Sequence, residues 1–174
     1  MSRVGKQPII LPQEVKISGG VVQGPKGTVK VNIPRGVEVV NKDGILTIAG
    51  GTNNIQGLTR TLIANAIKGV TVDWSKTLEL SGTGYRANVA NGQLQLAMGF
   101  SHPVAITAPD GIEFVVKENK ITVWGPDKAL VGLMAARIRG VRPADPYKAK
   151  GFIYEGEKII RKAGKAAKTG GTTK

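Results

Sequence analysis

The sequence predicts an α+β fold with two tandem copies of a mostly antiparallel β-sheet unit, each with one covering helix, followed by a basic C-terminal tail. Three observations lead to this prediction: the chain repeats itself at a nearly constant spacing, each repeat contains a hairpin signal, and an apolar pattern of helical period follows each hairpin. The 174 residues suffice for two small domains, and the apolar fraction of 41% is enough for a packed core.

The repeat consists of two pairs of matching segments. Residues 34–50 match 109–125 at an offset of 75, and residues 62–70 match 133–141 at an offset of 71. The change in offset places four extra residues in the first copy, within 51–57, where the Gly, Thr and Asn content predicts a loop. Two matches in the same order indicate a duplicated fold.

Each copy is expected to contain strands, then a hairpin, then a helix. In the first copy the hairpin turns at Asn41–Gly44, where Asp-Gly supplies the positive φ of a tight turn. In the second copy Asp127 is placed to cap a helix that ends near Gly140 and Pro143. Further strands are predicted at 15–23, 28–33, 77–81, 84–90 and 93–99. The two domains are expected at 1–81 and 82–174, the second with a basic extension from about 158.

Arg137 has an unusual place in this repeat. Aligning the copies puts it near the centre of the apolar stripe of the second helix, where the first copy has Ala66. Because an unpaired buried guanidinium is very costly, we expect its aliphatic stem to lie on the sheet and its head to reach an edge. The head then either pairs with a local acceptor or reaches a bound partner, and the first is the simpler interpretation.

The charge balance points to a polyanionic partner. Lys and Arg number 25 against 12 Asp and Glu, a net charge of +13. Residues 137–174 hold eleven basic and three acidic residues, while 82–136 is balanced. A solvated basic face is an equally plausible interpretation of such a run, but this one joins a Pro-rich segment at 142–151 to a tail without apolar periodicity. Basic extensions of this kind often order only against phosphates.

Several other function classes find no support in the sequence. No apolar run approaches the length of a membrane span, and the N-terminus lacks the apolar stretch of a signal peptide, so a cytoplasmic protein is expected. The chain has no cysteine and a single histidine, His102, so neither a metal site nor a cofactor is expected. Gly82-Thr83-Gly84 is no dinucleotide motif because a strand follows it. Nothing suggests catalytic residues.

Two aromatic–basic pairs are candidates for nucleic-acid contact. Tyr147 precedes Lys148 and lies close to Lys150, so the ring could stack on a base or ribose while the ammonium groups meet phosphates. Tyr85–Arg86 is a similar pair. Packing of Tyr147 on its own domain with a solvated hydroxyl is an equally good interpretation.

Five segments resemble the family of bacterial-type large ribosomal subunit protein six, the universal ribosomal protein L-six. They are Met1–Ile9, Gly57–Asn65, Gly84–Ala87, Gly99–Pro103 and Asp145–Gly151, of which the last resembles the family signature near the C-terminus. The chain departs from the family pattern at Ala149, where glycine is usual, at Arg137, and in the loop at 51–57, which is shorter and lacks charged residues.

This resemblance implies a structural protein of the large ribosomal subunit. Such a protein binds large-subunit ribosomal RNA chiefly through its C-terminal domain, near the sarcin–ricin loop and the stalk base where translational GTPases dock. Its partners would be that RNA, neighbouring ribosomal proteins near the stalk base and, transiently, the GTPases, with no membrane and no small-molecule substrate. It would work on the cytoplasmic ribosome, with a plastid ribosome as the open alternative.

Binding of this kind is dominated by contacts to the RNA backbone, so basic side chains of the C-terminal part are the expected phosphate contacts. They are Arg139, Arg142, Lys148, Lys150, Arg161, Lys162, Lys165 and Lys168. Tyr85 with Arg86 and Tyr147 are expected stacking or ribose contacts, and Ser101 and His102 turn contacts. Two alternatives remain open, a non-ribosomal RNA-binding factor of the same fold and an enzyme acting on RNA.

Overall fold

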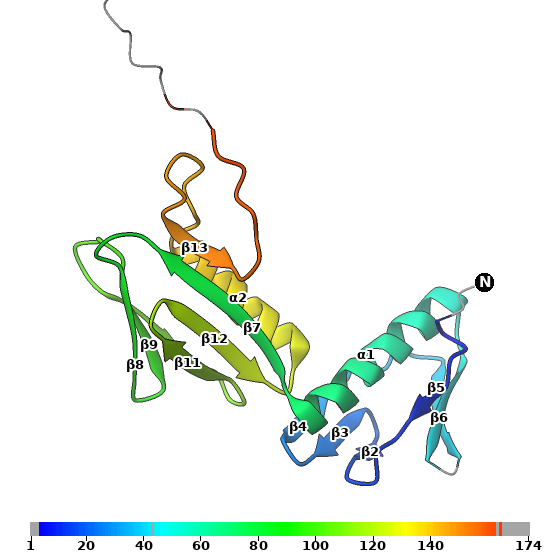
Figure 1. The fold of residues 1–174 in the computed structure, drawn as a ribbon. Coiled ribbons are helices and arrows are strands. Elements are labelled where there is room, and N and C mark those ends of the chain that lie inside the picture. Colours follow the sequence, from blue (N-terminus) through cyan, green and yellow to red (C-terminus); the bar gives the residue numbers. More distant parts are fainter. Residues whose placement is uncertain (1–3, 43, 163, 165–174) are drawn as a thin grey trace, which may run out of the picture.

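The computed structural model describes residues 4–42, 44–162 and 164, which form two units of similar design (Figure 1). The units lie side by side and meet where the first helix passes into the first strand of the second sheet. Each unit combines antiparallel sheets with one helix, so the predicted α+β class and the two covering helices are confirmed.

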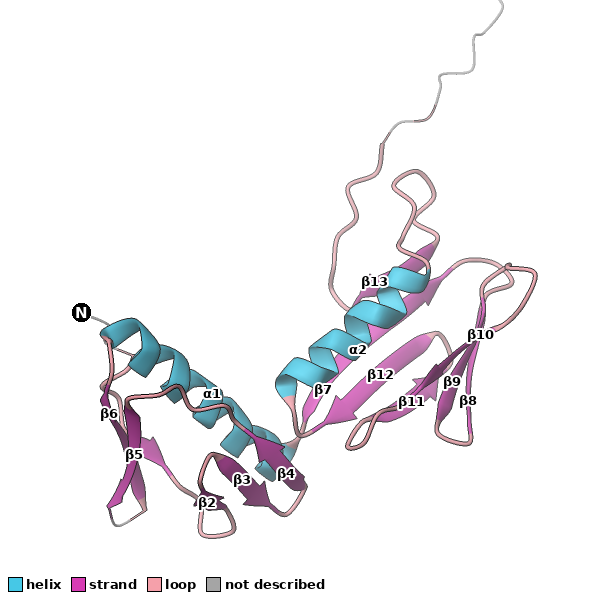
Figure 2. Ribbon diagram, turned by 180° about the vertical axis from the view of Figure 1, so that it is seen from behind, coloured by secondary structure: helices cyan, strands magenta, loops and turns pink. Residues whose placement is uncertain are grey.

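The first unit has two three-stranded sheets on one side of helix α1 (Figure 2). One sheet has the order β1-β6-β5, the other β2-β3-β4, and all neighbours are antiparallel. The elements are β1 (Ile9–Ile10), β2 (Lys16–Ser18), β3 (Val21–Gly24), β4 (Gly27–Lys30), β5 (Val37–Lys42), β6 (Ile45–Gly50) and α1 (Asn53–Val72).

The second unit follows the same plan with one strand added. Its sheets have the orders β11-β12-β7-β13 and β10-β9-β8, and helix α2 covers one face of the larger sheet (Figure 1). The elements are β7 (Trp74–Ser81), β8 (Arg86–Ala90), β9 (Gln93–Ala97), β10 (Val104–Thr107), β11 (Glu113–Lys117), β12 (Lys120–Gly125), α2 (Lys128–Val141) and β13 (Gly151–Tyr154).

The strand registers reproduce the duplication. Glu38 faces Ala49 in the first hairpin, and Glu113 faces Trp124 in the second, so the offset of 75 holds on both strands. Strand β1 pairs with β6 as β7 pairs with β12. The two units therefore share one pattern of strands before the helix.

Each unit has a core of its own, built from alternate strand residues and one helix face. In the first unit Val22, Leu46, Ile63 and Val70 are almost fully buried among other aliphatic side chains. The second core is larger and centres on Leu78, Leu94, Leu96, Ile121, Val123, Ile138 and Phe152. Two separate cores agree with the division into two folding units.

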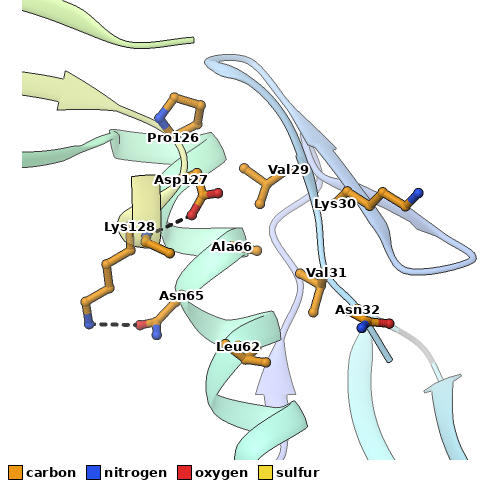
Figure 3. Close-up of a pocket in the computed structure, with 11 residues that line it drawn as sticks. Val29, Lys30, Val31, Asn32, Leu62, Asn65, Ala66, Pro126, Asp127 and Lys128 are labelled. Carbon is orange, nitrogen blue, oxygen red and sulfur yellow. Dashed lines mark hydrogen bonds between the residues drawn. The ribbon is translucent and has the colours of Figure 1, made fainter. Parts of the chain in front are cut away.

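The junction between the units is close-packed. The indole of Trp74 contacts two ammonium groups, with Lys68 Nζ at 4.6 Å and Lys128 Nζ at 4.5 Å from its ring centroid. Its Nε1 donates to the carbonyl oxygen of Asn65 at 3.0 Å. Lys128 also donates to Asn65 Oδ1 at 3.4 Å, a contact drawn in Figure 3. Gly69 of α1 meets the Pro126 carbonyl so closely that a side chain has no room.

Three local predictions were wrong. The stretch 51–57 is a loop only up to Thr52, since α1 begins at Asn53 and the extra residues lengthen the helix to 20 residues against 14 for α2. The single strand expected at 15–23 is a hairpin, because Gly19 and Gly20 both take positive φ and turn the chain. Strands β1, β10 and β13 were not predicted, since segments of two to four residues carry too little periodicity.

The prediction for Arg137 was also wrong, because the residue is exposed. Helix α2 buries Val131, Met134, Ala135 and Ile138, while Leu133 is 64% exposed. Helix α1 is buried over a broader arc because its Ala66 flank adjoins Val29 of β4 and Pro126 of the second unit (Figure 3). The corresponding flank of α2 has no such cover, so Arg137 faces solvent.

Candidate RNA-binding surface

The loop at 143–150 is held in shape by its own backbone. The Asp145 carboxylate accepts a hydrogen bond from Lys148 N at 3.0 Å, and the Asp145 carbonyl accepts one from Ala149 N at 2.8 Å. Asp145 N donates to the Lys150 carbonyl at 3.0 Å, which closes the loop. Ala149 is buried at φ 54°, a left-handed conformation that favours glycine. The closed loop thus fixes where its outward side chains lie.

Three predicted contact residues project from this loop. Tyr147 is 55% exposed, and Lys148 and Lys150 are exposed on either side of the buried Ala149. This exposure leaves part of the Tyr147 side chain open to solvent, as both interpretations of this residue require. An open ring flanked by ammonium groups can stack on a base or ribose while the charges meet phosphates.

The chain that follows β13 returns to the same loop. Lys162 N donates to the Pro146 carbonyl at 3.0 Å, so Arg161 and Lys162, both exposed, lie beside Tyr147. These basic residues come close to Tyr147 although fourteen or more positions separate them from it along the chain. Lys165 and Lys168 lie outside the described residues.

Arg142 links the loop to the neighbouring strands. Its guanidinium lies 5.1 Å from the ring centroid of Tyr85 and 5.4 Å from that of Phe100, and its Nη1 donates to the Met98 carbonyl at 2.7 Å. In turn, Phe152 N donates to the Arg142 carbonyl at 2.9 Å. The predicted residues Tyr85 and Arg142 therefore contact each other, and Arg142 positions the loops around it.

Sequence reasoning missed Phe100 as part of this cluster. The residue lies in the Gly99–Pro103 turn and is 44% exposed, so an aromatic side chain in a glycine-led turn was the available signal. Arg86, Ser101 and His102 are exposed in the same region, with Ser101 Oγ 3.3 Å from His102 Nδ1.

Arg139 has a protein partner. Its Nη2 donates to Glu157 Oε1 at 2.8 Å, and its guanidinium lies 5.3 Å from the Tyr154 ring centroid. The other oxygen of Glu157 accepts from Tyr154 N at 3.1 Å. This pairing ties the end of α2 to the end of β13, so Arg139 already has a structural role in the second unit.

The carboxylates of this region already bond to other groups of the protein, so they form no ion pairs with the basic side chains around Tyr147. Asp145 closes the loop, Glu157 pairs with Arg139, and Glu155 pairs with Lys120 at 2.8 Å. The hydrogen bond and charge of Lys120 hold the pKa of the Glu155 carboxyl below its usual value. Over the described ranges no ion pair involves Lys148, Lys150, Arg161 or Lys162. The surface is therefore electropositive.

Sites of other kinds are not found in the part of the chain that the structure describes. It holds no group of three His, Cys, Asp or Glu side chains that could bind a metal ion.

No helix among the described residues has the length and apolar character needed to cross a membrane.

Comparison with known proteins gives one consistent answer. A family model described as "Ribosomal protein L6" matches residues 81–155, the stretch that holds Tyr85, Arg142 and the loop at 143–150. Large ribosomal subunit protein uL6 of Synechococcus sp. strain RCC307 is 46% identical, that of strain WH7803 is 47% identical, and that of Prochlorococcus marinus strain MIT 9211 is 45% identical. Each alignment of 178 residues covers 97% of this chain and 99% of the relative. The resemblance seen in the sequence motifs is thereby confirmed, and the chain belongs to the ribosomal protein uL6 family.

Proposed function

We propose that this chain binds large-subunit ribosomal RNA through the surface formed by the loop at 143–150, the returning segment at 158–162, and Arg142 with the Tyr85 and Phe100 rings that it contacts. As a member of the uL6 family it is a structural constituent of the large ribosomal subunit and not an enzyme. The observation that carries the RNA proposal is the exposed, unneutralised group of Lys148, Lys150, Arg161 and Lys162 around Tyr147.

The chemistry of this surface suits backbone recognition. Four basic side chains within one small region can displace counterions condensed on the RNA, and they carry no sequence information of their own. Tyr147 adds a planar contact to a base or ribose. The rigid loop supports shape recognition, because its hydrogen bonds fix the spacing of the charges before RNA arrives.

The position near the sarcin–ricin loop and the stalk base, with neighbouring ribosomal proteins and transient translational GTPases as partners, is part of the same proposal. It follows from the family resemblance of the signature segment at 145–151. On this proposal the second unit anchors the protein. We further propose that the division between the units lies near residue 73, because β7 pairs with β12 and β13 of the second unit.

A salt titration tests the RNA proposal. The variant Lys148→Ala/Lys150→Ala is expected to reduce the magnitude of the slope of log affinity against log salt by about 1.4–1.8, since each phosphate contact contributes roughly 0.7–0.9. The matched variant Lys16→Ala/Lys30→Ala, which removes two exposed lysines from the first unit, should leave the slope unchanged. An unchanged slope in the loop variant would show that these lysines are only solvated.

Co-sedimentation separates a subunit component from a free RNA-binding factor of the same fold. The chain should stay with large subunits through washes at high salt, because many contacts hold an assembled protein. Quantitative release into the supernatant at moderate salt would favour the free factor.

A further inference from the structure

The small sheet β10-β9-β8 has an outer face unlike those of the other sheets. Apart from Arg86, the residues of this face are amides, alanines and Thr107, arranged by the strand registers in rows, and all but the half-buried Gln93 are exposed. These rows are Arg86–Ala97, Asn88–Gln95–Ala105 and Ala90–Gln93–Thr107. The opposite face, with Leu94, Leu96 and Ile106, is buried in the core of the second unit.

This face is nearly uncharged. No Asp or Glu occurs anywhere in residues 80–109, and Arg86 is the one Lys or Arg of that stretch. The other three sheets each contain lysines, such as Lys16 and Lys30 in the sheet that occupies the same place in the first unit. The face is therefore built unlike an ordinary solvated one.

One end of the β10-β9-β8 sheet adjoins Arg142 and the loop at 143–150 of the candidate RNA-binding surface. Arg142 contacts Tyr85, which immediately precedes β8, and its Nη1 donates to the carbonyl of Met98, which immediately follows β9. Gly151 pairs with Ser81, so the loop at 143–150 ends beside the chain that enters β8. The row Arg86–Ala97 of the outer face therefore lies at the end of the sheet where Arg142 contacts the chain.

The uncharged polar side chains of this face suit hydrogen bonds in a groove of RNA and not contacts to the backbone phosphates. The minor groove of an A-form RNA helix is wide and shallow and displays ribose hydroxyls and base edges. Asparagine and glutamine side chains both donate and accept, so they can hydrogen-bond to a hydroxyl that does the same. The alanines at 97 and 105 leave the surface flat enough for close approach, and a carboxylate here would face the repulsion of the flanking phosphates.

We propose that the outer face of the β10-β9-β8 sheet lies against the minor groove of a ribosomal RNA helix, with Asn88, Gln95 and Thr107 hydrogen-bonded to ribose hydroxyls. This inference rests on the proposed RNA-binding function and adds a second contact to it. Arg86, at the end of the face nearest the loop at 143–150, contacts a phosphate at the edge of the groove.

Directed cleavage of RNA tests the placement, since the chain has no cysteine of its own. Single variants Gln95→Cys, Lys148→Cys and Gln23→Cys, each carrying a tethered iron chelate, are assembled into large subunits and made to generate hydroxyl radicals. Gln23 is the exposed glutamine of β3, the corresponding strand of the first unit. From position 95 we expect strong cuts on both strands of one RNA helix, across a minor groove, at nucleotides not cut from position 23.

The outcomes separate the two proposals. Cuts from position 148 without cuts from position 95 would overturn this inference and leave the proposed function standing. A position 95 probe that cleaves a neighbouring protein in place of RNA would also overturn it. Absence of RNA cuts from both positions 95 and 148 would contradict the proposed function itself. Cuts at the same nucleotides from positions 23 and 95 would show that the cleavage is not local and would likewise overturn the inference.

A binding measurement adds an independent test with isolated large-subunit ribosomal RNA as the probe. Because Asn88 and Gln95 are exposed and uncharged, Asn88→Ala/Gln95→Ala should leave the thermal midpoint and the salt slope unchanged while affinity falls roughly tenfold. Gln95→Glu should weaken binding further, while Gln23→Glu, the matched added charge in the first unit, should not. Unchanged affinity in both position 95 variants would overturn the inference.

Discussion

Replacing Gly69 by alanine tests whether the two units are held in one fixed arrangement. A Cβ at this position would lie 1.9 Å from the Pro126 carbonyl oxygen and 2.9 Å from Trp74 Cδ1. Both neighbours belong to the second unit, and the nearest is backbone, which cannot move aside as a flexible side chain can. The substitution therefore has to push the units apart or bend α1.

The magnitude follows from two opposing effects. Alanine for glycine inside a helix ordinarily stabilises by roughly 0.5–1 kcal/mol, while overpacking a close contact costs typically about 1–3 kcal/mol. We expect a net loss of up to about 2 kcal/mol for Gly69→Ala. For a protein of this size about 2–4 °C of thermal midpoint accompanies each kcal/mol, so the midpoint should fall by up to about 8 °C.

Helix α2 offers matched controls. Gly132 and Gly140 have no atom within 4 Å of an added Cβ, and Gly140 is the repeat equivalent of Gly69. Gly132→Ala should raise the midpoint by about 1–4 °C through helix propensity alone, and Gly140→Ala, close to the helix end, by less. Thermal unfolding of the three variants decides the matter. A Gly69→Ala protein as stable as Gly132→Ala would refute the close contact at the junction.

Three further outcomes are expected. Ala149→Gly should raise the free energy of unfolding by up to about 1 kcal/mol in denaturant titration, because glycine removes the cost of φ 54°; a clear loss of stability would show that the buried methyl group matters more. Arg137→Ala should change stability by less than about 0.5 kcal/mol, since the side chain is exposed, so any fall in RNA affinity would reveal a direct contact. Lys120→Met should return the pKa of Glu155, followed by NMR titration, upward to its usual value. Because the pKa of Glu155 is lowered in the folded protein, the ion pair stabilises the fold at pH values above the usual carboxyl pKa, and this stabilisation is lost as the pH falls through the folded pKa. A Glu155 titration that the substitution does not change would contradict the pairing.

The sequence by itself determined the features that depend on neighbouring residues. Asp127 caps α2 by accepting from Ala129 N at 2.8 Å, as its place before an apolar period predicts. The duplicated hairpins could also be predicted from the sequence, because the strand register repeats at the offset of the sequence match. The concentration of positive charge in residues 137–174 needed only counting, and the motif at 145–151 sufficed to indicate the family.

The tertiary structure alone decided which groups meet across the chain. Arg142 donates to Met98, 44 positions away, and no local pattern could foresee that its guanidinium would lie between Tyr85 and Phe100. The orientation of α2 was beyond the sequence for the same reason. Helical periodicity defines a stripe, but whether Ala66 or Arg137 at its flank is covered depends on what packs beside the helix. In the first unit β4 and the turn at Pro126 adjoin that flank, whereas in the second it faces solvent, so two helices of matching sequence bury different arcs.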